Sequence, residues 1–97
     1  MTRSIQRLAA EDLAEAVRFY KSEAGVGIAR RFLVEFERVV ALLELHPGFG
    51  TPTADGRRVH PLSDFPYAIL YRQDDVGLRI LVVRHQSRDP GYGDRRR

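Results

Sequence analysis

The 97-residue sequence contains no cysteine, no tryptophan and a single lysine, Lys21. Without cysteine the chain can form no disulfide, and zinc sites with thiolate ligands are excluded. No apolar run is long enough to cross a bilayer, and the first residues lack the apolar block of a secretion signal, so we expect a cytoplasmic protein. Hydrophobic residues make up 43% of the chain and charged residues 30%. This length and composition predict one globular domain over residues 1–97.

Positive charge is concentrated in the second half of the chain. Residues 1–50 carry seven basic and seven acidic side chains, whereas residues 51–97 carry nine basic and six acidic ones, which gives the net charge of +3. Every basic residue except Lys21 is an arginine. The planar guanidinium group suits phosphate and carboxylate partners, but GC-rich codon usage produces the same bias. The composition therefore fits a nucleic acid or an acidic protein surface and identifies neither.

Apolar residues at helical spacing predict two helices in the first half of the chain. The first runs from about Ala10 to Ala24, with Glu11 and Asp12 in its first turn. Its apolar stripe consists of Leu13, Ala16, Val17 and Tyr20, and its polar side of Asp12, Glu15, Arg18 and Lys21. The second runs from about Gly27 to Leu45 and ends before His46-Pro47-Gly48. The connection around Gly25 is so short that the helices must be antiparallel neighbours.

Alternating and β-branched residues predict a sheet in the second half. Strands are expected at residues 57–62, 65–72 and 78–85, joined by turns, and weak alternation over residues 3–8 predicts a short N-terminal edge strand. The last strand is apolar on both faces in its middle, which favours a well-covered position. The predicted fold class is α+β: an N-terminal antiparallel helical hairpin packed on a small, mainly antiparallel β-sheet.

Three stretches of the chain, in this order, resemble the ParE/RelE toxin superfamily of plasmid-stabilisation proteins. They are Asp12–Tyr20 with Ala29–Leu33, then His46–Pro52, then Phe65–Arg72 with His85–Tyr92. The resemblance implies a RelE/ParE-like fold and the toxin component of a bacterial type II toxin–antitoxin system. ParE-type members are associated with inhibition of DNA gyrase, and RelE-type members with cleavage of mRNA on the ribosome.

The residues place the chain closer to ParE than to RelE. RelE-like ribonucleases typically carry an arginine within a Tyr-Arg-Leu-Val-Tyr-like strand, and the matching stretch here, Tyr67–Tyr71, has Ala68 at that position. A pair of lysines ahead of that strand is also missing. The expected activity is therefore gyrase inhibition by protein binding, without a cofactor. Gly93 stands where the family often has tryptophan, which removes a natural binding anchor.

The resemblance also implies site residues. The candidates for target binding are Arg84, His85, Gln86, Arg88 and Tyr92. If the chain were instead a metal-independent endoribonuclease, its catalytic candidates would be His85, Arg88, Tyr92 and Arg58. The alternative for His85 is a partly buried residue at a strand end, and the alternative for Arg95–Arg97 is a frayed, solvated terminus. No metal site is predicted, because the three histidines lack the spacing of ligands.

The expected partners are a cognate ParD-like antitoxin, whose C-terminal segment folds on the toxin, and DNA gyrase. Phe19, Tyr20 and Phe49 are candidates for antitoxin binding, since Phe19 and Tyr20 cannot both face the core. No membrane contact is expected, and DNA would be contacted only indirectly through the antitoxin. A third interpretation is an inactive binding module within a toxin–antitoxin repressor complex.

Overall fold

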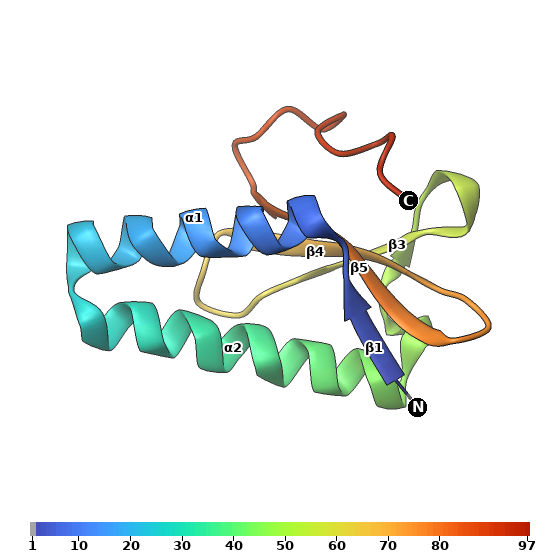
Figure 1. Cartoon of the computed structure of the whole chain (residues 1–97), viewed down its shortest axis with the longest axis horizontal. Helices are drawn as coiled ribbons and strands as arrows, with labels where there is room; N and C mark the ends of the chain where they lie inside the picture. The colour runs from blue at the N-terminus through green and yellow to red at the C-terminus, as the bar shows by residue number, and fades with distance from the viewer. Residues whose placement is uncertain (1) are drawn as a thin grey trace.

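The computed structural model describes residues 2–97 and has a helical hairpin on one side of a five-stranded sheet (Figure 1). The elements are β1 (Thr2–Ile5), α1 (Arg7–Ala24), α2 (Val26–Leu45), the 3-10 turn η1 (Pro47–Phe49), β2 (Thr51–Pro52), the 3-10 turn η2 (Ala54–Gly56), β3 (Arg58–Pro61), β4 (Tyr67–Gln73) and β5 (Gly77–His85). The strand order is β1-β5-β4-β3-β2, in which β1 runs parallel to β5 and the other pairs are antiparallel. The predicted α+β fold and the short N-terminal edge strand are confirmed.

Helix α1 begins three residues earlier than the sequence predicts. The side chain of Gln6 caps it by accepting hydrogen bonds from the backbone N–H groups of Leu8 and Ala9, at 2.7 and 3.2 Å. Glu11 and Asp12 therefore do not lie in the first turn, and that expectation was wrong. Glutamine is not among the preferred capping residues, and the amphipathic pattern becomes visible only from Leu13 onward.

The helical hairpin turns at Gly25, whose φ of +93° suits glycine. Helix α2 starts directly afterwards and places its apolar stripe on the sheet, where Phe32, Val39 and Leu43 are fully buried. Tyr20 joins Phe32 in an aromatic cluster with Phe65 and Tyr67, with ring centroids 5.1 to 6.1 Å apart. Neither helix of residues 2–97 combines the length and the apolar character needed to cross a membrane.

The strands agree with the predicted ranges to within a few residues at their ends. Strand β2 was not predicted, because its two residues lie in a segment rich in turn-forming residues, and it pairs with Val59 and Arg58 of β3. Between β4 and β5 the register shifts: Leu70 lies opposite Val82 while Tyr71 lies opposite Ile80. Leu81 is the extra residue of this bulge.

Each face of the sheet has its own apolar cluster. Ile69, Tyr71, Ile80 and Val83 face the helices and belong to the main core. Leu70, Leu81 and Val82 form a second cluster, which is joined by Val59 and Tyr92. Because Tyr92 lies in the C-terminal segment 86–97, this segment covers the face of the sheet that the helices leave open (Figure 1, red trace).

Candidate target-binding face

The C-terminal segment 86–97 turns back over the sheet directly after β5. Its first backbone N–H, that of Gln86, donates to the carbonyl oxygen of Pro66 at 2.8 Å. Tyr92 then packs on the second apolar cluster, and Gly93 follows with a φ of +81°. A Cβ atom on Gly93 would overlap Cγ2 of Val82. Both the positive φ and the close approach to the sheet therefore require glycine at this position.

A buried carboxylate on helix α1 fixes the position of the C-terminal segment. The side chain of Asp12 accepts hydrogen bonds from the Tyr92 hydroxyl and from Arg96 Nη1, each at 2.5 Å. The side chains of Asp12 and Arg96 are only 6% and 9% exposed. The prediction that Asp12 lies on the polar, outer side of the helix was wrong. Asp12 lies inward because it shares a helix face with the small residues Ala9 and Ala16, which leave space for a polar cluster.

The same ion pair completes the edge of β5. Strand β1 ends beside Ile80, whose carbonyl oxygen accepts a hydrogen bond from the backbone N–H of Gln6 at 2.8 Å. Beyond that point the backbone N–H of Val83 donates to Asp12 Oδ2, and the carbonyl oxygen of Leu81 accepts from Arg96 Nη1, both at 3.1 Å. Buried main-chain groups require partners. Asp12 and Arg96 therefore supply the partners that β1 no longer provides.

Arginines of the sheet and its flanking loop hold the C-terminal segment through its carbonyl oxygens. Arg57 donates to the carbonyl oxygens of Asp94 and Arg96 at 2.5 and 2.7 Å, and Arg84 donates to that of Pro90 at 2.9 Å. The expectation that Arg95–Arg97 form a frayed terminus is therefore wrong for Arg96, whose side chain is buried. Arg95 and Arg97 are exposed, as expected.

The polar cluster changes the acidity of its members. The hydrogen bond to Asp12 and burial raise the pKa of the Tyr92 hydroxyl above its ordinary value of 10.0. The pKa of Arg96 is also raised: burial lowers it, but the hydrogen bonds to Asp12 and Tyr92 outweigh that effect. Tyr92 is therefore a neutral hydrogen-bond donor at neutral pH and is a poor general base.

The five predicted target-binding residues lie around the end of β5 and the start of the C-terminal segment. Gln86 and Arg88 are exposed, whereas Arg84, His85 and Tyr92 are half-buried. The guanidinium of Arg88 lies over the Tyr92 ring, 4.4 Å from its centroid, and also lies 3.7 Å from the carboxylate of Glu15 on α1. Arg84 and His85 point to opposite faces, since Arg84 contacts Pro90 while the His85 ring meets Tyr67 edge-on. We call these five residues together the target-binding face, after the role that the family resemblance implies for them, although they are not confined to one side of the sheet.

Of the four ribonuclease candidates, Arg58 lies apart from His85, Arg88 and Tyr92. Arg58 pairs with Tyr71 and His85 with Tyr67, which puts them about 13 Å apart along β4 at roughly 3.3 Å per residue. The Arg58 guanidinium donates to the carbonyl oxygen of Gly50 at 2.8 Å. His85 accepts at Nδ1 from the backbone N–H of Ser87 at 3.0 Å. Arg58 and His85 thus each have a structural partner, as Tyr92 has in Asp12.

The candidates for antitoxin binding differ in exposure. Phe19 is 54% exposed and Phe49 is 58% exposed, while Tyr20 packs in the aromatic cluster of the core. Phe49 stacks on the ring of His46 with centroids 4.7 Å apart. Phe19 and Phe49 lie near opposite ends of the helical hairpin, since the 20 residues of α2 span about 30 Å.

Sequence reasoning missed Asp12 and Arg96 as structural partners. A signal for Asp12 was present, because Ala9, Asp12 and Ala16 follow the i, i+3, i+7 spacing of one helix face. No comparable signal existed for Arg96, since it lies in a segment without helical or strand periodicity.

Comparisons with known proteins agree with this architecture. The solved structure described as "Chromosomal ParDE TA system from P. aeruginosa" superposes with a TM-score of 0.77 at 24% sequence identity, over 88% of this chain and 95% of that one. No curated protein matches the sequence. The family model described as "ParE toxin of type II toxin-antitoxin system, parDE" matches residues 4–90. The chain therefore belongs to the family of ParE toxins of type II toxin–antitoxin systems.

Proposed function

We propose that this ParE toxin inhibits DNA gyrase by binding it through the target-binding face, without a hydrolytic step of its own. The observation that carries the proposal is the C-terminal segment held on the sheet by the Asp12–Arg96 ion pair. This attachment leaves Arg88 exposed on the fixed ring of Tyr92. Arginine and tyrosine are frequent anchors in protein interfaces. A surface that is already ordered loses less conformational entropy on binding than a flexible tail does.

The alternative, RelE-type cleavage of mRNA, has weaker support. At the position where RelE-like enzymes carry a strand arginine, this chain has Ala68, which lies opposite Arg84 in the sheet. Because it pairs with Ala68 across β4 and β5, Arg84 is the arginine that could replace the missing strand arginine. Its guanidinium, however, already donates to the carbonyl oxygen of Pro90. The raised pKa of Tyr92 disfavours its ionised form, which a general base would need.

We further propose that a cognate, ParD-like antitoxin neutralises the toxin by folding its C-terminal segment over the helical hairpin. Phe19 and Phe49 are exposed aromatic side chains, and Val34 and Leu45 of α2 are 64% and 77% exposed. Exposed apolar groups of this kind suit a segment that folds on binding. Tyr20 lies within the core cluster and would act only as support for Phe19, with which it makes an edge contact. This interaction would take place in the cytoplasm.

A supercoiling assay with purified gyrase tests the target. The wild-type toxin is expected to inhibit supercoiling, and Arg88→Ala to weaken the inhibition roughly tenfold or more, because truncating an interface arginine commonly costs more than 1 kcal/mol. Arg30→Ala on the outside of α2 is the matched control and should inhibit as wild type does. The proposal fails if saturating wild-type toxin leaves supercoiling unchanged.

An mRNA assay separates the two remaining interpretations. Intact mRNA on translating ribosomes is expected with wild-type toxin, whereas cleavage that disappears in His85→Ala would establish the ribonuclease. An inactive module would leave both supercoiling and mRNA unaffected and would not slow growth when expressed alone. Co-expression with the antitoxin should restore growth, and Phe19→Ala combined with Phe49→Ala should weaken that rescue.

A further inference from the structure

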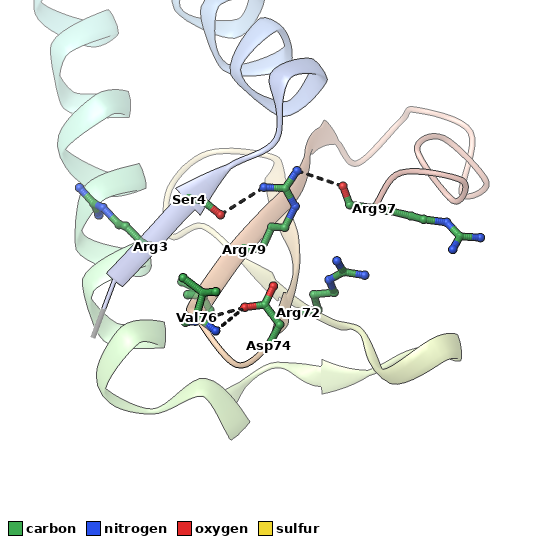
Figure 2. Close-up of a pocket in the computed structure, with 9 residues that line it drawn as sticks. Arg3, Ser4, Arg72, Asp74, Val76, Arg79 and Arg97 are labelled. Atoms are coloured by element: carbon green, nitrogen blue, oxygen red, sulfur yellow. Dashed lines mark hydrogen bonds between the residues drawn. The ribbon is translucent and has the colours of Figure 1, made fainter.

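A pocket of about 620 Å³ opens where β4 turns into β5, beside β1 (Figure 2). Its lining includes the four arginines Arg3, Arg72, Arg79 and Arg97, and the acidic residue Asp74. The pocket lies near the loop between β4 and β5, whereas the target-binding face begins at the far end of β5. It therefore belongs to a different part of the molecule.

Two of these arginines lie directly opposite each other in the sheet. Arg72 of β4 pairs in register with Arg79 of β5, and both side chains are half-buried. Their neighbours Tyr71, Leu78 and Ile80 face the helices, so alternation places Arg72 and Arg79 on the other face. Like charges at directly opposed positions destabilise a sheet. An anion held between the two guanidinium groups would remove that repulsion.

The hydrogen bonds in the pocket leave donor capacity unused. Arg3 is paired with Glu37 and Glu44 at 2.6 and 3.4 Å and contributes little free charge. Arg79 donates to the Ser4 hydroxyl at 3.2 Å and to the main-chain oxygen of Arg97 at 3.1 Å (Figure 2). Nε of Arg72 is buried and has no hydrogen-bond partner among the described residues. A buried donor without an acceptor is costly, so a partner that reaches it would stabilise this arginine.

The acidic side chain in the pocket, that of Asp74, is already engaged. Asp74 Oδ1 accepts hydrogen bonds from the backbone N–H groups of Val76 and Gly77, at 2.9 and 3.2 Å (Figure 2). These bonds lower the pKa of Asp74, and the charges of Arg72 and Arg79 lower it further. Asp74 therefore stabilises the β4–β5 turn and offsets only part of the positive charge of the two arginines.

We propose that this pocket binds a phosphate group carried by a larger molecule, with Arg72 and Arg79 as its two ligands. A phosphate brings up to two negative charges and several acceptor oxygens, which match two guanidinium forks better than one carboxylate does. The volume exceeds what a single phosphate fills, which favours a nucleotide or a nucleic-acid strand as the carrier. None of the described residues that line the pocket is aromatic, so bases have no stacking platform and recognition is independent of base identity.

Calorimetric titration at low ionic strength tests the proposal with four probes: inorganic phosphate, a nucleoside triphosphate, a short DNA duplex and polyglutamate. The triphosphate or the duplex is expected to bind the wild-type protein more tightly than polyglutamate of equal charge. Arg72→Gln and Arg79→Gln should each weaken that binding about tenfold or more, the loss expected when a charged hydrogen bond is removed. The control Arg30→Gln, on helix α2, should bind as wild type does.

The pattern across probes identifies the carrier. Binding of the duplex that falls steeply with salt, while the triphosphate binds weakly, indicates a nucleic-acid backbone, and the reverse pattern indicates a nucleotide. Arg72→Lys keeps the charge and loses the planar fork, so it should bind more weakly than wild type and more tightly than Arg72→Gln.

Three results would overturn the proposal: no binding of any phosphate probe, equal losses in Arg30→Gln and Arg72→Gln, or polyglutamate binding as tightly as the phosphate probes. Thermal melting verifies folding, and Arg72→Gln should not lower Tm, because it removes one of two opposed like charges, whereas Arg79→Gln also loses the hydrogen bonds to Ser4 and Arg97. The proposal does not rest on gyrase inhibition. If gyrase is the target, Arg72→Gln should inhibit supercoiling as wild type does. Failure of the phosphate-binding proposal is therefore distinguished from failure of the gyrase proposal.

Discussion

On the helix side of the sheet, large apolar side chains from α1, α2, β4 and β5 pack together, whereas the opposite side is covered by segment 86–97, which has neither helix nor strand. The helices are held on their side of the sheet by the hydrophobic effect. Segment 86–97 is held on the opposite side by the Asp12–Arg96 ion pair, by hydrogen bonds from arginines to carbonyl oxygens, and by a small apolar cluster under Tyr92. The comparison separates the interactions that fold this domain from those that hold segment 86–97 on the sheet.

The largest loss of stability is expected on the helix side. Phe32 is fully buried and contacts the rings of Tyr20, Phe65 and Tyr67. Phe32→Ala should lower the free energy of unfolding by about 3–5 kcal/mol, because it removes apolar contact and leaves a cavity. Urea unfolding followed by circular dichroism measures the change. A loss below about 1 kcal/mol would mean that the helix-side core does not dominate stability.

The next largest loss is expected from the ion pair that joins the two sides. Asp12→Ala leaves the buried Arg96 guanidinium without its anion and the Val83 N–H without its acceptor, so we expect a loss of about 3 kcal/mol. The neighbouring Glu11→Ala, which affects only a surface pair with Arg7, should cost less than about 0.5 kcal/mol. Adding Arg96→Met to Asp12→Ala should recover part of the loss. Equal losses for Asp12→Ala and Glu11→Ala would contradict a buried, structural ion pair.

A smaller loss, confined to the C-terminal segment, is expected from Gly93→Ala. The new methyl group would overlap Val82 and the residue would keep a φ of +81°, which together should cost about 1–3 kcal/mol. Gly91→Ala is the matched control, because a Cβ there meets nothing closer than 3.5 Å. The two variants are compared by thermal melting. If both melt alike, segment 86–97 does not lie against β5 as described.

The smallest effect, and the one that depends on pH, is expected from Tyr92→Phe. At neutral pH the variant loses the hydrogen bond to Asp12, at a cost of about 1 kcal/mol. The pKa of Tyr92 is raised in the folded state, so its contribution to stability is present below pH 10.0 and is lost as the pH rises through the folded pKa. The difference in unfolding free energy between wild type and Tyr92→Phe should therefore shrink above about pH 10. A difference that is constant with pH would contradict the Asp12–Tyr92 bond.

These two regions also differ in how far the sequence predicted them. The helical hairpin and three strands follow from spacing, because a 3.6-residue or 2-residue period is repeated along each element. The predicted position of Asp12 was wrong, because the residue was assigned to the outer face on the basis of its charge, although Ala9 and Ala16 on the same helix face point inward. The attachment of Arg96 could not be predicted, because it joins residues 84 positions apart and uses main-chain oxygens that no sequence pattern marks.

The candidate site was predicted in outline only. The family resemblance is confirmed by the match over residues 4–90. The roles of His85 and Arg88 at the target remain predictions, since they depend on a partner surface. In the structure Arg84 and His85 face opposite sides of the sheet, as the alternation of adjacent strand residues implies.

Amide hydrogen exchange tests most directly whether segment 86–97 is a fixed layer of this toxin. The backbone N–H groups of Tyr92, Asp94 and Arg96 donate within the segment at 2.9 to 3.1 Å. In the wild-type protein they should exchange about tenfold or more slowly than in Asp12→Ala. The amide of Leu62, which donates to the carbonyl oxygen of Tyr67 away from this cluster, serves as the reference for global unfolding. Exchange of the three amides at the rate of an unfolded chain in the wild-type protein would contradict the account.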